Sequence, residues 1–121
     1  MRLLTIITTN RERDLPQAFL RRCVRLDIED PRDVDSLVRI AAQHYPSGKP
    51  ERMRMVAETL LRLRDKADKL RLRRPGTAEF LDAVHACEKL DLPVSKDPGR
   101  VWSQIERAIL AKDDTLRASG R

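Results

Sequence analysis

The sequence predicts a mainly α-helical protein, in which four amphipathic helices follow a short strand–helix–strand unit. Three observations lead to this prediction. Apolar residues recur at spacings of three and four from residue 34 onward, and two apolar, β-branched runs lie before residue 30. The composition, 36% charged and 3% aromatic, is that of a folded, helix-rich chain whose core is built from aliphatic side chains. The 121 residues are enough for one such core.

The N-terminal segment is predicted to form a strand, a short helix and a second strand. Residues 3–9, LLTIITT, are apolar with little alternation, as in a strand covered on both faces. The DLP sequence at 14–16 predicts a helix start, and QAFLRR at 17–22 follows it. Residues 23–30, CVRLDIED, alternate between apolar and polar, which indicates a strand exposed on one face. Because two strands do not make a stable parallel sheet alone, this unit is expected to be part of a βαβ arrangement.

Four helices are predicted in the rest of the chain. Asp33 is expected to cap the first, which ends at YPSGKP, and the second runs from about Pro50 to Lys69. Thr77 is expected to cap the third, and the DP sequence at 97–98 to begin the fourth. The polar tail after Lys112 is expected to fray. Amphipathic helices of this length with short loops predict a small helical bundle.

Basic residues are concentrated in one stretch, residues 62–74, although the whole chain carries a net charge of +6. A nucleotide phosphate, a nucleic acid or an acidic protein surface would each suit such a face. A solvated helix end is an equally good reading of most of these side chains. The scarcity of aromatic rings argues against a base-stacking surface. The basic residues of the stretch are Arg62, Arg64, Lys66, Lys69, Arg71, Arg73 and Arg74, against Asp65 and Asp68.

The candidate metal ligands do not form a recognisable site. Cys23, Cys87, His44 and His85 lack metal-binding or redox spacing, so no metal is expected. The opening sequence MRLLTIITTN has too short an apolar run for a signal peptide or a membrane span. We therefore expect a cytoplasmic protein with reduced thiols and no membrane span.

Polar and basic residues follow two of the predicted elements. Asn10 ends the first strand, at the edge where open α/β sheets bind ligands, and its amide can orient a water against a phosphate. The alternative is a local side-chain turn that only closes the strand. Arg21 and Arg22 end the short helix. They can stabilise the charge on a phosphate transferred in a neighbouring subunit, oppose the helix C-terminus, or pair with acids.

The order of these features resembles a known family. TIITTNRERDLPQAFLRRCVRLDIEDP, residues 5–31, is similar to the second half of the nucleotide-binding core of AAA+ ATPases of the MoxR-like kind. The resemblance continues through RLRDKADKLRLRRPGTAEFLDAV and VWSQIERAILAKDD, and so covers about residues 3–114. It implies that residues 1–30 are a partial βαβ remnant of a P-loop NTPase core. Residues 31–121 would then be the helical lid domain.

The resemblance also implies roles for individual residues. Asn10 matches the sensor 1 residue, which reads the γ-phosphate and helps to place the attacking water. Arg21 and Arg22 match the arginine-finger position, which acts on ATP bound by the adjacent subunit of a ring. The parent protein is then expected to be an oligomeric ATPase that uses ATP and Mg²⁺ to remodel a protein client.

The chain departs from the family pattern in two places. RRPGTAE lies where sensor 2 opens the third lid helix, but Ala78 and Glu79 stand where the family has an arginine. Either Arg73 or Arg74 takes over the nucleotide contact, or the contact is absent. The Gly-rich phosphate loop and the Mg²⁺-holding acidic segment, which lie upstream of sensor 1 in the family, do not occur in residues 1–121. We therefore expect this chain alone neither to hydrolyse ATP nor to bind it tightly.

Two other functions fit parts of the sequence. A stand-alone helical adaptor would bind a protein partner through an apolar face that the missing sheet leaves uncovered. A basic nucleic-acid-binding helical protein would use residues 62–74, and its affinity would fall steeply with salt. The resemblance favours the ATPase over both and argues against a nucleic-acid partner.

Overall fold

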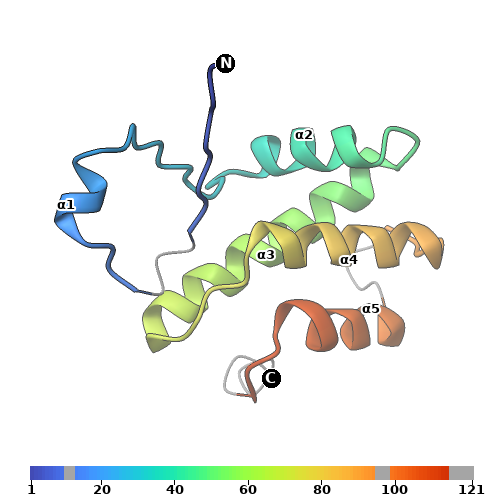
Figure 1. Cartoon of the computed structure of the whole chain (residues 1–121). Coiled ribbons are helices and arrows are strands. Elements are labelled where there is room, and N and C mark those ends of the chain that lie inside the picture. Colours follow the sequence, from blue (N-terminus) through green and yellow to red (C-terminus); the bar gives the residue numbers. More distant parts are fainter. Residues whose placement is uncertain (10–12, 95–98, 115–121) are drawn as a thin grey trace.

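The computed structural model describes residues 1–9, 13–94 and 99–114, and Figure 1 shows that this part of the chain is mainly helical. The five α-helices described are followed by one short π-helical segment, and no strand is formed within the described residues. The elements are α1 (Gln17–Leu20), α2 (Val34–His44), α3 (Pro50–Leu70), α4 (Thr77–Lys89), α5 (Gly99–Ile105) and η1 (Glu106–Leu110).

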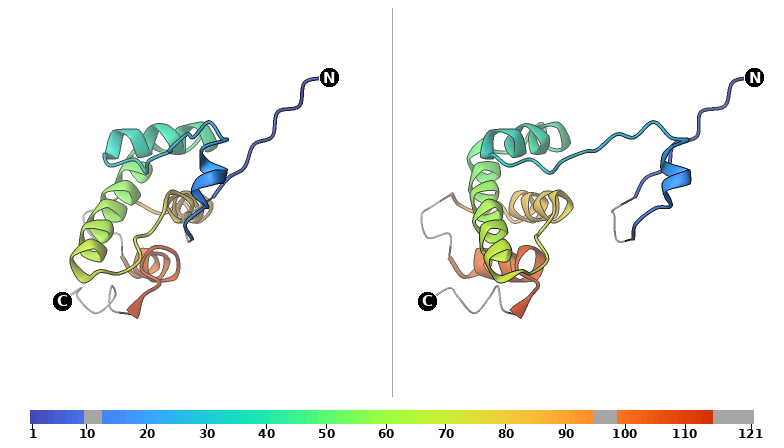
Figure 2. Two further views of the ribbon diagram at one scale, coloured as in Figure 1. Left: turned by 60° about the vertical axis from the view of Figure 1, so that its left-hand side comes forward. Right: turned by 90° about the vertical axis from the view of Figure 1, so that its left-hand side faces the viewer.

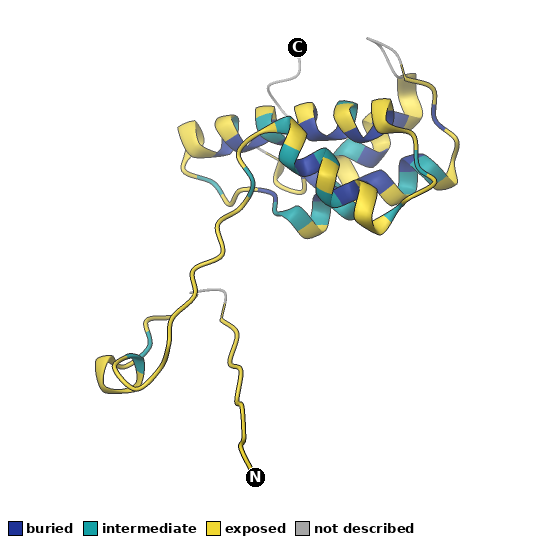
Figure 3. Cartoon of the chain, turned by 90° about the horizontal axis from the view of Figure 1, so that it is seen from above, coloured by how far each residue is buried: buried dark blue, intermediate teal, exposed yellow. Residues whose placement is uncertain are grey.

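Helices α2 to α5 and η1 form one body, which we call the helical body (Figures 1 and 2). Helix α3 is the longest and packs against α2 and α4, while α4 also contacts α5 and η1. The buried side chains of these helices face one another, and their outer faces are exposed (Figure 3). Aliphatic residues build most of this core, together with Phe80 and Trp102. The mainly helical prediction is therefore confirmed.

The predicted starts of α2 and α3 are confirmed. The Asp33 carboxylate accepts a hydrogen bond of 2.8 Å from the Ser36 backbone N–H, as an N-cap should, and Pro50 occupies the first turn of α3. The start of α4 is predicted one residue too late. Gly76 takes the extended cap position, and its N–H donates to Glu79 Oε2 at 3.0 Å. Thr77 is already helical and leaves its hydroxyl for another contact.

The last helix differs from the predicted single α-helix. Its predicted start at 97–98 lies outside the described residues, and the described part changes from α to π geometry after Ile105. The wider π turn shifts the buried face by one position, because it inserts an extra residue into the helical repeat. Leu110 and Ala111 are consequently buried, whereas Ala108 is exposed.

The two predicted strands do not form. Residues 3–9 and 23–30 are extended but have no ladder partner among the described residues, so the βαβ prediction is wrong for this chain on its own. Only the short helix between them, α1, is present. We call residues 1–30 the N-terminal arm, and its described parts, residues 1–9 and 13–30, project away from the helical body (Figures 2 and 3). A strand needs backbone hydrogen bonds from a neighbour, and an apolar pattern alone does not supply them.

Helix α3 ends at a residue in an unfavourable backbone conformation, which gives a first prediction. Arg71 has φ 54° and ψ 39°, in the left-handed region, and the Leu72 N–H bonds back to Ala67 O at 2.8 Å. Because glycine enters this region without a Cβ clash, Arg71→Gly is expected to raise the free energy of unfolding by about 0.5–1 kcal/mol. Urea denaturation of the variant and of the original chain measures this difference in the free energy of unfolding. Arg62→Gly, inside α3, should lower stability by a similar amount, and a loss in both variants would contradict the assigned helix end.

The two cysteines are expected to react very differently. Cys87 is buried in α4, and burial raises the pKa of its thiol to about 11, whereas Cys23 is exposed on the N-terminal arm. Since the thiolate is the reacting form, one thiol per native chain should react with a disulfide reagent within minutes and two after unfolding in guanidinium. Cys23→Ser is the control and should leave no fast thiol. Two fast thiols in the native protein would contradict the packing of α4.

Candidate functional site

The N-terminal arm carries three of the five predicted site residues. Asn10 lies outside the described residues, so its predicted sensor role stays a prediction. Arg21 and Arg22 lie in the turn that closes α1, where their backbone N–H groups bond to Gln17 O at 3.0 Å and Phe19 O at 3.1 Å. Both arginines are exposed. Their guanidinium groups form no hydrogen bond or ion pair with any described residue, so they remain available to an anion.

The other two predicted site residues lie in the loop between α3 and α4. Arg73 Nη2 is 3.4 Å from Glu79 Oε1, and Arg74 Nε is 3.3 Å from Asp68 Oδ1. Both side chains of the Arg74–Asp68 pair are exposed, and such pairs contribute at most about 1 kcal/mol, so phosphate oxygens could replace that carboxylate at little cost. In the other pair Arg73 is exposed, but the Glu79 side chain is only 14% exposed and also accepts from the Gly76 N–H. The carboxylates nevertheless reduce the positive potential that sequence alone assigns to this loop.

The structure keeps the two arginine pairs apart. Helix α1 stands away from the helical body in Figure 1 and in the right-hand view of Figure 2, so the turn with Arg21 and Arg22 is not packed against the α3–α4 loop. One chain thus offers two separate basic positions rather than a single cluster of guanidinium groups.

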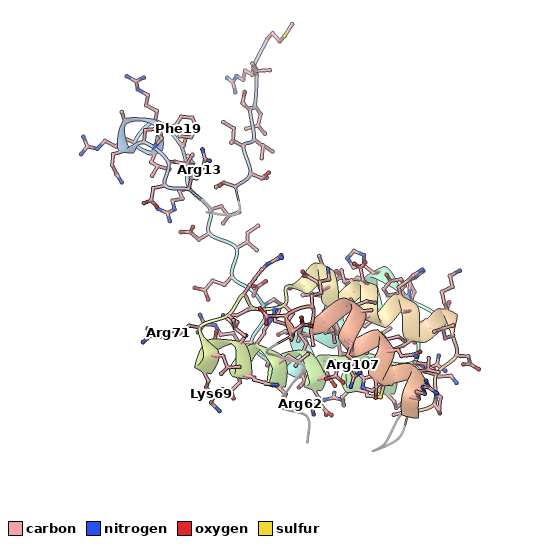
Figure 4. The ribbon with its side chains drawn as sticks, turned by 90° about the horizontal axis from the view of Figure 1, so that it is seen from below. Arg13, Phe19, Arg62, Lys69, Arg71 and Arg107 are labelled. Carbon is pink, nitrogen blue, oxygen red and sulfur yellow. The ribbon has the colours of Figure 1, made fainter. Side chains whose placement is uncertain are left out.

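The basic stretch at residues 62–74 is less uniform than its composition indicates. Arg62, Lys69 and Arg71 lie along the exposed side of α3 and its end, and Figure 4 labels them together with Arg107 of η1. Lys69, however, pairs with Asp65 at 2.7 Å. Arg64 is buried, so it is not part of any exposed face, contrary to the sequence-based interpretation. A polyanion-binding surface is correspondingly less well supported.

Sequence reasoning missed two buried arginines, both in α3. Arg52 and Arg64 are only 3% and 2% exposed. Their positions in the sequence could have indicated this burial. Arg52 lies four residues from Val56 and Arg64 four residues from Leu60, and both of these are core residues on the apolar stripe of the helix. A charged side chain in such a position is expected to have buried partners.

Arg52 ties the start of α3 to the end of α4. Its Nε donates to Leu92 O at 2.6 Å, Nη1 donates to Glu88 Oε2 at 3.0 Å, and Nη2 donates to the Asp91 carboxylate. The hydrogen bond with Asp91 is the main cause of the raised pKa of Arg52. Lys49 also approaches Asp91, with 3.7 Å between Nζ and Oδ1. This network fixes the turn that follows α4.

The same network predicts how stability depends on pH. The hydrogen bond from Arg52 lowers the pKa of Asp91, and the bonds from Ser36 lower the pKa of Asp33. A lowered folded-state pKa stabilises the protein above the unfolded value, near 3.9, and this stabilisation is lost as the pH falls through the folded value. Melting temperature should therefore be flat from pH 7 to about pH 5 and fall below about pH 4.

Two variants check this assignment. In Asp91→Asn the melting temperature should fall less steeply with decreasing pH than in the original chain, because one of the responsible carboxylates has been removed. Asp82→Asn, on the exposed face of α4, is the matched control and should keep the original dependence. Identical acid profiles for Asp91→Asn and the original chain would contradict the role of the network.

Three negative findings bear on the candidate site. No protein-family model, curated protein or solved structure matches this chain. Across residues 1–9, 13–94 and 99–114, no group of three or more His, Cys, Asp or Glu side chains could hold a metal ion. In the same part of the chain, none of the helices combines the length and apolarity required to cross a membrane.

Proposed function

We propose that residues 1–121 are the C-terminal portion of an AAA+ ATPase of the MoxR-like kind. In this proposal α2, α3, α4 and the α5–η1 segment are the four-helix lid domain, and the N-terminal arm completes the α/β core of the same ATPase. The parent protein binds and hydrolyses ATP in a ring and remodels a protein client.

The observation that carries the proposal is the apolar surface of the N-terminal arm. Its large aliphatic side chains are at least 77% exposed at six positions. Burying each of these side chains would stabilise the folded protein by roughly 1.5–3 kcal/mol. The arm alone does not gain this stabilisation, because its apolar side chains stay exposed. A β-sheet contributed by another segment would cover two strand-like segments with this apolar pattern. The six residues are Leu3, Leu4, Ile6, Val24, Leu26 and Ile28.

The positions of the arginines suit the roles that the resemblance gives them. Arg21 and Arg22 lie on an arm that projects from the helical body, as a group that reaches a neighbouring subunit must (Figure 2). A guanidinium there would stabilise the charge that develops on the transferred phosphoryl group. Arg73 and Arg74, beside the start of α4, would hold phosphate oxygens of ATP bound in their own subunit. Asn10 would orient the attacking water. No residue of this chain is proposed as a Mg²⁺ ligand.

A helical protein-interaction module is the second candidate, because the same exposed side chains could bind a different protein. The two functions differ in what completes the arm. The ATPase requires a segment with a Gly-rich phosphate loop, and the interaction module requires only an apolar partner surface.

Phosphate release tests the proposal. Residues 1–121 alone, with ATP and Mg²⁺, should release phosphate only at the rate of the buffer. The longer ATPase, meaning residues 1–121 joined to the phosphate-loop segment expected directly upstream in the reading frame, should turn over steadily. An upstream reading frame without a Gly-rich phosphate loop would contradict the proposal, and so would turnover by residues 1–121 alone.

A further inference from the structure

Arg64 holds together two segments that are far apart in the sequence. Its Nε donates to Pro75 O at 2.8 Å, and its Nη1 donates to Pro31 O at 2.7 Å. The guanidinium group is planar and rigid, so its two donors fix the two carbonyl groups relative to each other. Both prolines are neighbours of a helix start, Pro31 before α2 and Pro75 before α4.

A second link lies beside the first. The Thr77 hydroxyl donates to Asp30 Oδ1 at 3.2 Å, and the same carboxylate oxygen is 3.9 Å from Arg64 Nη2. Arg64 Nη2 is buried and has no hydrogen-bond partner within the described part of the chain. The carboxylate of Asp30 therefore provides the nearest opposite charge, and Arg74, Glu79 and Asp68 contribute further charges around the guanidinium group.

These contacts meet where the N-terminal arm joins the helical body. Residues 30–31 form the junction between the arm and the start of α2 at Val34. Residues 73–77 carry the paired arginines and begin α4. We propose that Arg64 is a positioning residue that couples this junction to the α3–α4 loop. The arm cannot then change direction at residues 30–31 without disturbing the start of α4.

The coupling is independent of ATP chemistry, although its consequence for an ATPase rests on the proposed function. There it would connect the arm that bears Arg21 and Arg22 with the loop that bears Arg73 and Arg74. A movement of the helical body would be transmitted to the arm through Arg64, assisted by the neighbouring hydrogen bond between Thr77 and Asp30.

Hydrogen exchange of single amides in the complete chain, followed by NMR, tests the coupling. Arg64→Lys keeps the charge, but an ammonium group cannot span both carbonyls in the geometry of the guanidinium fork. Exchange should rise by about 10-fold or more at the first turns of both α2 and α4, because the guanidinium fork that fixes the two carbonyl groups relative to each other is lost. The reporter amides, each hydrogen-bonded in the structure, are Ser36, Leu37, Gly76 and Phe80.

The other buried arginine supplies a matched control. Arg52→Lys should raise exchange at the Leu92 amide, which bonds to Cys87 O at 3.1 Å, and leave the four reporter amides unchanged. The Tyr45 amide, at the far end of α2, should respond to neither substitution. This pattern separates local coupling from a general loss of stability, which would raise exchange everywhere.

A milder variant covers the case in which Arg64→Lys does not fold. Asp30→Ala removes the bond to Thr77 and the nearby charge but keeps Arg64, so the same four amides should exchange about 2–5-fold faster. The proposal is overturned if a folded variant raises exchange at only one of the two helix starts, or if all amides change equally. Phosphate release is not involved, so failure of the ATPase proposal would leave this result interpretable.

Discussion

Replacement of both Arg21 and Arg22 by alanine is expected to lower the ATP turnover of the longer ATPase by roughly 10³-fold or more. These guanidinium groups are exposed and have no partner among the described residues, so their removal takes nothing from the folded core. Under the proposed function, the variant loses the stabilisation of charge on the transferred phosphoryl group. Steady-state phosphate release measures the effect, and the circular dichroism spectrum should be unchanged.

Arg13→Ala is the matched control, since Arg13 is an exposed arginine on the same arm (Figure 4). It should leave turnover within about two-fold of the original. Because the finger is proposed to act on a neighbouring subunit, mixing the double variant with subunits that lack the phosphate-loop lysine should restore part of the turnover. Full activity of the double variant, or no recovery in any mixture, would remove the finger assignment.

Arg52→Ala is expected to lower the free energy of unfolding by about 2–4 kcal/mol, the largest effect predicted for any charged residue of the helical body. The substitution removes all three donors of Arg52 at once. It leaves Glu88 Oε2 and the Leu92 carbonyl without their Arg52 donors, although the Lys49 N–H still bonds to Glu88 Oε1 at 2.9 Å. The stem of the Arg52 side chain also no longer fills the core. Urea denaturation followed by circular dichroism gives the change.

Arg54→Ala is the control for this substitution. Arg54 lies in the same helix and forms one exposed ion pair, 2.8 Å between Nη2 and Asp35 Oδ1. Its replacement should change stability by less than about 1 kcal/mol. Similar losses in the two variants would show that burial does not distinguish Arg52 from an ordinary surface arginine.

The helices could be predicted because the chain itself covers their apolar faces. The spacing of apolar residues places α2, α3 and α4 correctly, since each stripe is buried against another helix of the same body. The buried arginines were missed for a different reason. A count of charges in residues 62–74 ignores position on the helix, and position is what buries Arg64 while Arg62 stays exposed.

The strands and the site are harder to predict from the sequence. A strand depends on a neighbouring strand, and the site depends on side chains from distant parts of the chain, and the local sequence pattern shows neither. The sequence of residues 3–9 has the composition of a strand, but a strand forms only against a neighbour. The carboxylates that face Arg73 and Arg74 come from α4 and α3, and only the folded loop brings each pair together. Arg21 and Arg22 are exposed, and their predicted function remains a proposal.

Amide hydrogen exchange over residues 3–8, 24–26 and 28–30 tests most directly whether the arm is the remainder of a nucleotide-binding core. In residues 1–121 alone these amides should exchange within seconds, since these residues form no strand ladder within the described part of the chain. In the longer ATPase the same amides should exchange on the order of 100-fold more slowly or beyond, because a sheet then covers them. Slow exchange in residues 1–121 alone, or equally fast exchange in both proteins, would contradict this account.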